Sequence, residues 1–164
     1  MTPAGGGSLL AAVERSSLAT ALRTDLWLYP IVEIFHIAGF VVLVGSVLVF
    51  DLRVLGLSRG VSARALARHA LPWSAGALLV IVPTGLMMFS AHATEFVDNR
   101  AFLAKMLLIM LALTNAAAFH VGVFRTVGTW DTHVAAPAAA KLHALASLVI
   151  WFTVIACGRL IAYV

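Results

Sequence analysis

Four long apolar runs restrict this chain more than any other feature of its sequence. They cover Leu26–Phe50, His69–Ala91, Phe102–Phe124 and Pro137–Val164. Each is long enough to cross a hydrocarbon layer about 30 Å thick, which takes roughly 20 helical residues. Charged residues make up only 11% of the chain, whereas soluble domains carry about a quarter. The sequence therefore predicts an all-α integral membrane protein, a four-helix up-down bundle over residues 26–164.

The remaining residues, 1–25, form an N-terminal segment. Apolar residues recur there at roughly helical spacing, with Leu10, Val13, Leu18 and Leu22 among them. This pattern predicts an amphipathic helix lying on the membrane surface. A frayed N-terminal extension is the alternative.

The loops predict an orientation. The connection between the first two runs carries Arg53, Arg59, Arg64 and Arg68, whereas Asp51 is its one acidic residue. With Arg125 and Lys141 this side holds six basic residues, against five on the other side. Basic loops stay cytoplasmic, so we expect a multi-pass protein of the bacterial inner membrane with both termini in the periplasm. Because the basic residues lie at helix ends, the net charge of +4 does not indicate a nucleic-acid partner.

Each apolar run contains one histidine: His36, His69, His120 or His143. An ionisable side chain inside a span costs a few kcal/mol and is a functional-site hypothesis by default. At about 1.5 Å per residue, His120 and His143 lie about 6 Å from the cytoplasmic ends of their helices. His69 lies near the same level, whereas His36 is about 14 Å from the outer face. Three histidines are therefore expected in one inner layer.

Two imidazoles at one depth can take both axial positions of a b-type haem, so we expect one or two haems. Three imidazoles could instead bind copper or zinc. The structural alternative is that the histidines form hydrogen bonds between helices or reach the headgroups. Arg68 and Arg125 are suitably placed to hold the propionates of an inner haem.

Methionines add a second possibility in the outer half. Met87 shares a face of its helix with His69, and Met106 shares one with His120. They could ligate a second haem or Cu(I), or simply fill gaps in the core.

Glu33 and His36 are three residues apart and face the same way on one helix. The carboxylate could orient a ligating imidazole, or accept protons from a quinone or tetrapyrrole at the outer face. It could also lie near enough to the interface to be hydrated.

Three stretches carry a family resemblance: YPIVEIFHIAGFVVLVGSVLVFDLRVLG, FLAKMLLIMLALTNAAAFH and KLHALASLVIWFTVIACGRLIAY. They resemble an uncharacterised four-span bacterial membrane protein family that looks related to CopD-type copper-resistance proteins and HemJ-type protoporphyrinogen oxidases. These in turn are similar to cytochrome b-like membrane bundles. The resemblance implies a four-helix bundle whose span histidines bind haem, and it covers His36 most directly.

The leading hypothesis is a haem b-binding membrane protein that moves electrons between a quinone or other membrane donor and a redox partner protein, alone or as a homodimer. It could be an oxidoreductase or an electron-transfer component without an enzymatic activity of its own. The alternatives are a copper-handling membrane protein that uses histidine and methionine, and a non-catalytic membrane subunit.

Overall fold

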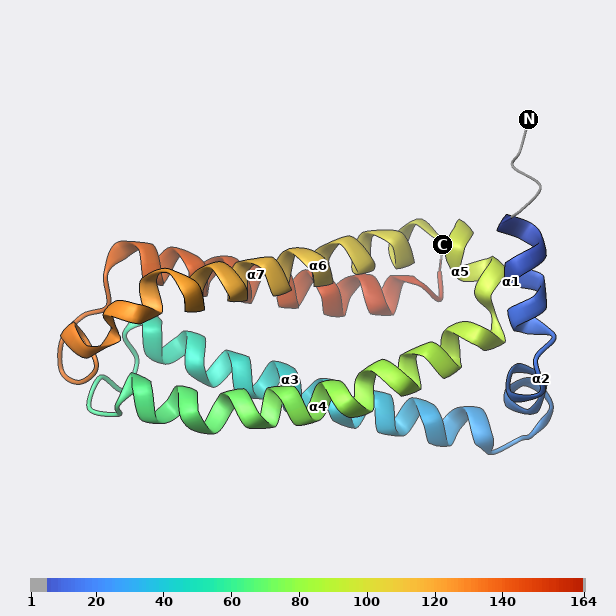
Figure 1. Ribbon diagram of the computed structural model, residues 1–164, viewed down its shortest axis with the longest axis horizontal. Helices are drawn as coiled ribbons and strands as arrows, with labels where there is room; N and C mark the ends of the chain where they lie inside the picture. Colours follow the sequence, from blue (N-terminus) through green and yellow to red (C-terminus); the bar gives the residue numbers. More distant parts are fainter. Residues whose placement is uncertain (1–5, 164) are drawn as a thin grey trace.

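The computed structural model describes residues 6–163, and all the regular structure within them is helical (Figure 1). In chain order the elements are α1 (Gly6–Glu14), α2 (Ser17–Thr24), α3 (Leu28–Leu55), α4 (Ala63–Ala91), α5 (Ala93–Asp98), α6 (Arg100–Val121), the 3-10 helix η1 (Val123–Thr129) and α7 (Ala138–Leu160). Helices α3, α4, α6 and α7 are long and apolar enough to cross a membrane. The predicted all-α, four-helix architecture is confirmed, and it indicates a multi-pass membrane protein.

The helix ends follow local capping signals. Ser16, Ser62 and Asn99 each accept a hydrogen bond from the backbone N–H three residues later, at the starts of α2, α4 and α6. Gly56 ends α3 in the left-handed conformation, with φ of 120°. The first span therefore continues to Leu55, five residues beyond the end of its predicted run.

The long helices pack as two pairs. Helix α3 packs along α4, α6 packs along α7, and contacts between α3 and α7 join the pairs. Within the described chain, α4 and α6 have no Cα positions within 8 Å of each other. Their side chains meet through Phe89 and Phe102, whose ring centroids are 5.8 Å apart. The bundle is thus built around α3 and α7, and α7 is the most buried span.

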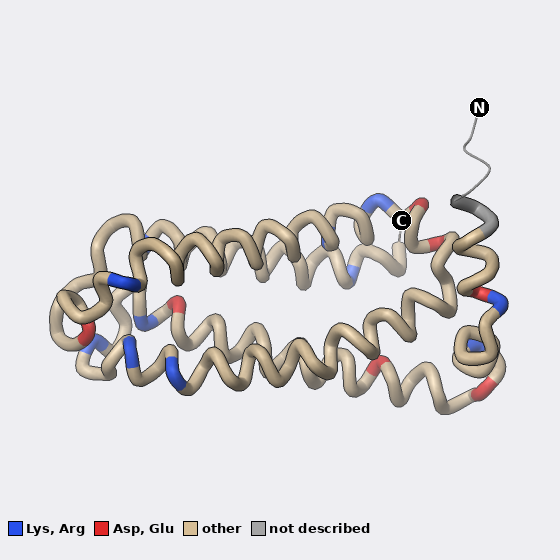
Figure 2. The backbone as a smooth tube through the Cα atoms, viewed as in Figure 1, with Lys and Arg blue, Asp and Glu red and all other residues tan. Residues whose placement is uncertain are grey.

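The two ends of the bundle differ. Figure 1 shows α1, α2, α5 and the last turn of α7 at one end, here called the terminal end. The α3–α4 loop, η1 and the start of α7 form the opposite end, here called the loop end. Figure 2 shows charged residues mostly towards these two ends, with a long uncharged middle between them. This distribution is the one expected of a bundle that crosses a membrane.

The N-terminal segment forms two short helices that dock on the terminal end. Glu14 Oε1 accepts hydrogen bonds from the Thr94 hydroxyl at 2.6 Å and the Thr94 N–H at 2.8 Å. These bonds hold the pKa of the Glu14 carboxyl below its usual value, and the bond from the Thr94 hydroxyl has the larger effect. Arg23 Nη1 donates to Ala91 O at 2.7 Å. Helices α1 and α2 are therefore tied to the end of α4 and to α5.

At the loop end, Asp131 joins the two interhelical connections. Its carboxylate accepts from the Ser62 hydroxyl at 2.9 Å and the Arg64 N–H at 2.8 Å. The Arg64 N–H is the main cause of a lowered Asp131 pKa. Buried Arg53 donates to Asp131 O at 2.8 Å. This clamp holds the α3–α4 loop against the segment that precedes α7.

Candidate functional site

His36 is a half-buried residue of α3 whose ring is oriented by α4. Its Nδ1 lies 3.1 Å from Ile81 O and 3.0 Å from Thr84 Oγ1. The Thr84 hydroxyl donates to Val80 O at 2.6 Å, so its oxygen is left to accept. Two acceptors at Nδ1 place the proton there and leave the lone pair on Nε2. No hydrogen bond to Nε2 is found in the described part of the chain.

Gly85 makes room for this ring. A Cβ atom at Gly85 would lie 3.1 Å from His36 Cε1, closer than side chains normally approach. Gly76, on the same helix, has nothing within 4 Å of the corresponding position. The glycine one turn after the carbonyl that binds His36 is therefore part of the construction that holds the imidazole.

His143 is held in the same way on α7, by Asn115 of α6. Asn115 Nδ2 donates to His143 O at 3.0 Å, which turns Asn115 Oδ1 towards the imidazole. His143 Nδ1 then donates to that oxygen at 2.7 Å. As at His36, the proton is on Nδ1 and Nε2 carries the lone pair. Histidines that ligate metals typically have their other ring nitrogen bound to such an acceptor.

His120 lies in an aromatic cluster near the loop end of α6. Its ring centroid is 5.3 Å from that of Phe119, 5.1 Å from that of Phe124 and 6.5 Å from that of Phe50. Phe119 is also 6.0 Å from the His143 ring. The predicted inner layer therefore contains His120 and His143, whose rings both lie near the ring of Phe119.

The other inner residues do not join them. His69, Arg68 and Arg125 have exposed side chains. Nowhere in residues 6–163 do three or more His, Cys, Asp or Glu side chains gather into a group that could hold a metal ion. Of the three histidines expected at one level, the structure brings two together.

Glu33 has an exposed side chain, and no hydrogen bond or ion pair joins it to His36 among the described residues. The groups that orient His36 are on α4 instead. The methionines also separate: Met87 packs against the cluster of Leu22, Val32 and Ala91, whereas Met106 is 38% exposed. The two methionines of the copper alternative therefore do not share a site with each other in the described chain.

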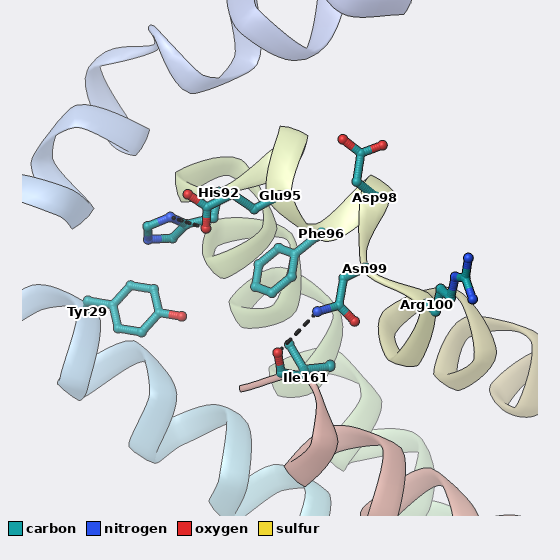
Figure 3. Close-up of a pocket in the computed structure, with 8 residues that line it drawn as sticks. All are labelled: Tyr29, His92, Glu95, Phe96, Asp98, Asn99, Arg100 and Ile161. Carbon is teal, nitrogen blue, oxygen red and sulfur yellow. Dashed lines mark hydrogen bonds and ion pairs between the residues drawn. The ribbon is translucent and has the colours of Figure 1, made fainter. Parts of the chain in front are cut away.

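A pocket of about 620 Å³ opens at the terminal end, among α3, α5 and the ends of α6 and α7. In Figure 3 the Tyr29 and Phe96 rings and the Asn99 amide face a common space, and Asp98 points away from it. His92 Nδ1 is 3.3 Å from Glu95 Oε2 at its edge. The sequence did not predict this pocket, because most of its polar residues lie in α5 and its flanking turns, which the hydropathy pattern does not mark.

Asp51 was predicted to lie in the loop between the first two spans, and this prediction is wrong. Because α3 continues to Leu55, Asp51 lies inside the helix and is only 6% exposed. Gly56, a strong helix stop five residues later, was the signal in the sequence.

The chain belongs to the DUF6644 family, a family of unknown function whose model matches residues 14–164. No curated protein and no solved structure matches it. The resemblances to copper-resistance proteins, protoporphyrinogen oxidases and cytochrome b-like bundles therefore stay predictions.

Proposed function

We propose that this DUF6644 protein is a membrane electron-transfer protein that holds haem b through intramembrane histidines, with His36 as a principal ligand. The observation that carries the proposal is the state of the His36 ring: Nδ1 is bound to Ile81 O and Thr84 Oγ1, and Nε2 is left as a ligand nitrogen. Nε2 is not among the enclosed, unpartnered atoms of the described chain, so it is open to a ligand from outside the protein.

His143 is the corresponding ligand in the loop half of the bundle, with His120 as its neighbour. His36 is about 12 Å along α3 from the terminal end, and His143 is about 8 Å along α7 from the loop end. His36 and His143 therefore serve separate positions, in line with the expectation of one or two haems. Haem iron supplies one-electron chemistry when bound, and the protein sets its potential through ligands and burial.

The chain's own residues would perform the binding and the tuning. Ile81 O, Thr84 and Asn115 orient the two imidazoles with a proton on Nδ1 and strengthen Nε2 as a ligand. Phe50, Phe119 and Phe124 exclude water from the inner layer. The terminal pocket, with Tyr29, Phe96 and Asn99, is the proposed contact site for a quinone or for a redox partner protein.

The test is a titration of haemin into the haem-free protein in detergent, followed by Soret absorbance. We expect saturable binding by the wild type, and affinity at least 10-fold lower, or one site fewer, in His36→Ala and His143→Ala. The matched control is His69→Ala, an exposed histidine that should bind as the wild type does. No Soret change in the wild type would overturn the proposal.

A further inference from the structure

Asp51 is the most enclosed acidic side chain of the spanning helices, and half of its carboxyl group has no partner. It is 6% exposed, and no hydrogen bond to Oδ2 exists among the described residues. The Ser147 hydroxyl of α7, itself in a residue 9% exposed, lies beside the carboxyl group. Asp51 therefore faces α7 in the interior of the bundle, and not lipid.

No cation neutralises this carboxyl group. In the described chain, no Lys, Arg or His nitrogen lies within 4 Å of it. Arg53, two residues away, donates from Nε and Nη2 to the main-chain oxygens of Val61, Arg59 and Asp131. Its Nη1 is buried and has no hydrogen-bond partner among the described residues, and it does not pair with Asp51. In the loop half of the bundle the other titratable groups of the packed helices are His143 and Lys141 on α7, His120 on α6, and the exposed Arg64, Arg68 and His69 on α4. The α4 residues of the neighbouring core cluster are alanines: Ala63, Ala67 and Ala70.

Asp131 is a carboxylate with a structural role, and its contacts differ from those of Asp51. Asp131 is bound by the Ser62 hydroxyl and the Arg64 N–H, and it clamps two loops. Asp51 clamps nothing comparable, yet an unpaired buried carboxylate oxygen costs free energy. A side chain kept at that cost inside a span is a functional-site hypothesis.

The ligand that fits this site is a proton. A metal cation such as Ca²⁺ takes six or more oxygen ligands, whereas the side chains here offer one carboxyl group and one hydroxyl. A proton needs one carboxyl oxygen, and the acid that forms donates a single hydrogen bond. Asp51 is also about 6 Å from the loop-end terminus of α3, close to water on that side.

We propose that Asp51 is an intramembrane proton-exchange site, assisted by Ser147 and open to the loop end of the bundle. The carboxylate takes one proton from water on that side and returns it, and no other bond is made or broken. The site stands independently of haem binding.

The experiment is infrared difference spectroscopy of the full-length, haem-free protein in liposomes, titrated with pH. We expect a carboxylic-acid C=O band that gains intensity as pH falls and that is lost in Asp51→Asn. Glu33→Gln, which removes an exposed carboxyl group from the same helix, should keep that band. In Ser147→Ala the band should shift to higher frequency because a hydrogen bond is lost, whereas Ser74→Ala, whose hydroxyl binds Ala70 O on its own helix, should not shift it.

Identical difference spectra for the wild type and Asp51→Asn would overturn the proposal. A band that responds to added Na⁺ at constant pH would replace the proton with a metal cation. If Asp51→Asn fails to fold, an unshifted band in Ser147→Ala would equally contradict the assignment. None of these outcomes depends on haem, so the failure of this inference and that of the proposed function can be told apart.

Discussion

The imidazole of His36 is fixed by contacts that lie entirely on the neighbouring helix. The Nδ1–H group donates to Ile81 O and Thr84 Oγ1. Gly85 leaves the space that the edge of the ring occupies. Such a ring has little freedom to rotate, so Nε2 keeps one direction. A ligand nitrogen of fixed direction is what a preorganised cofactor site requires.

Gly85→Ala should disturb this ring, because its Cβ would lie 3.1 Å from His36 Cε1. Gly76→Ala is the matched change on α4, where nothing lies within 4 Å. We expect Gly76→Ala to be neutral or stabilising by up to about 1 kcal/mol, and Gly85→Ala to be less stable than it by about 1–2 kcal/mol. Unfolding in mixed micelles measures both. Equal stability, with an unchanged ¹⁵N shift of His36 Nδ1, would mean that Gly85 has no such role.

Asn115→Ala should remove the acceptor that sets the tautomer of His143. An interhelical hydrogen bond of this kind contributes about 0.5–2 kcal/mol in membrane proteins, and we expect a loss of that size in the free energy of unfolding. Thr114→Val is the control, since that exposed hydroxyl binds only Met110 O of its own helix. If the two variants lose the same stability, the Asn115 side chain does not support His143.

At this scale the sequence indicates candidate residues but not the groups that orient them. His36 and His143 follow from one histidine per apolar run. Their acceptors do not, because Ile81 O is a backbone atom and Asn115 is one polar residue among several. Asp51 was misassigned because hydropathy marks the end of an apolar run, whereas α3 ends where Gly56 adopts positive φ.

Among the helices, the N-terminal pair shows how a short element gains a fixed position. Helices α1 and α2 would be marginal alone, and Glu14 and Arg23 tie them to α4 and α5. An amphipathic pattern in residues 9–22 predicted a helix. The break between α1 and α2 and the docking onto α5 depend on tertiary contacts with Thr94 and Ala91, which no local pattern reveals.

Docking of α1 should weaken in acid. The lowered Glu14 pKa means that the ionised form is the one bound in the docked state, so its contribution is complete above the ordinary glutamate value of 4.5. It is lost as pH falls below that value and through the lowered pKa. Hydrogen exchange of α1 amides, corrected for intrinsic rates, should show this loss of protection. Glu14→Gln should remove the pH dependence; a pH response that persists in this variant would assign it to another group.

For the whole molecule, the four-span bundle was predictable because four apolar runs leave few other folds. The arrangement of the four spans as two pairs joined through α3 and α7 was not predictable. Which helices touch depends on side-chain packing, so the separation of α4 from α6 along most of their length has no signature in the hydropathy pattern. The oriented histidines His36 and His143 thus lie on α3 and α7, the spans whose backbones approach each other across the two pairs in the described chain.

The basic loop end should face the cytoplasm. Thr132 lies in the exposed loop before α7, and Val97 lies on α5 at the terminal end. The test uses the variants Thr132→Cys and Val97→Cys as labelling sites. Both would be made with Cys157→Ala, which removes the single native thiol. In intact cells a membrane-impermeant maleimide should label Val97→Cys and should label Thr132→Cys only after permeabilisation. The reverse pattern would invert the topology.

The most direct test of the central claim is the dithionite-reduced minus oxidised absorption spectrum of the protein purified from membranes. We expect a Soret shift and a sharp alpha band of haem b, both weaker in His36→Ala and unchanged in His69→Ala. A flat difference spectrum from folded, membrane-inserted protein would contradict it, and the intramembrane histidines would then be structural.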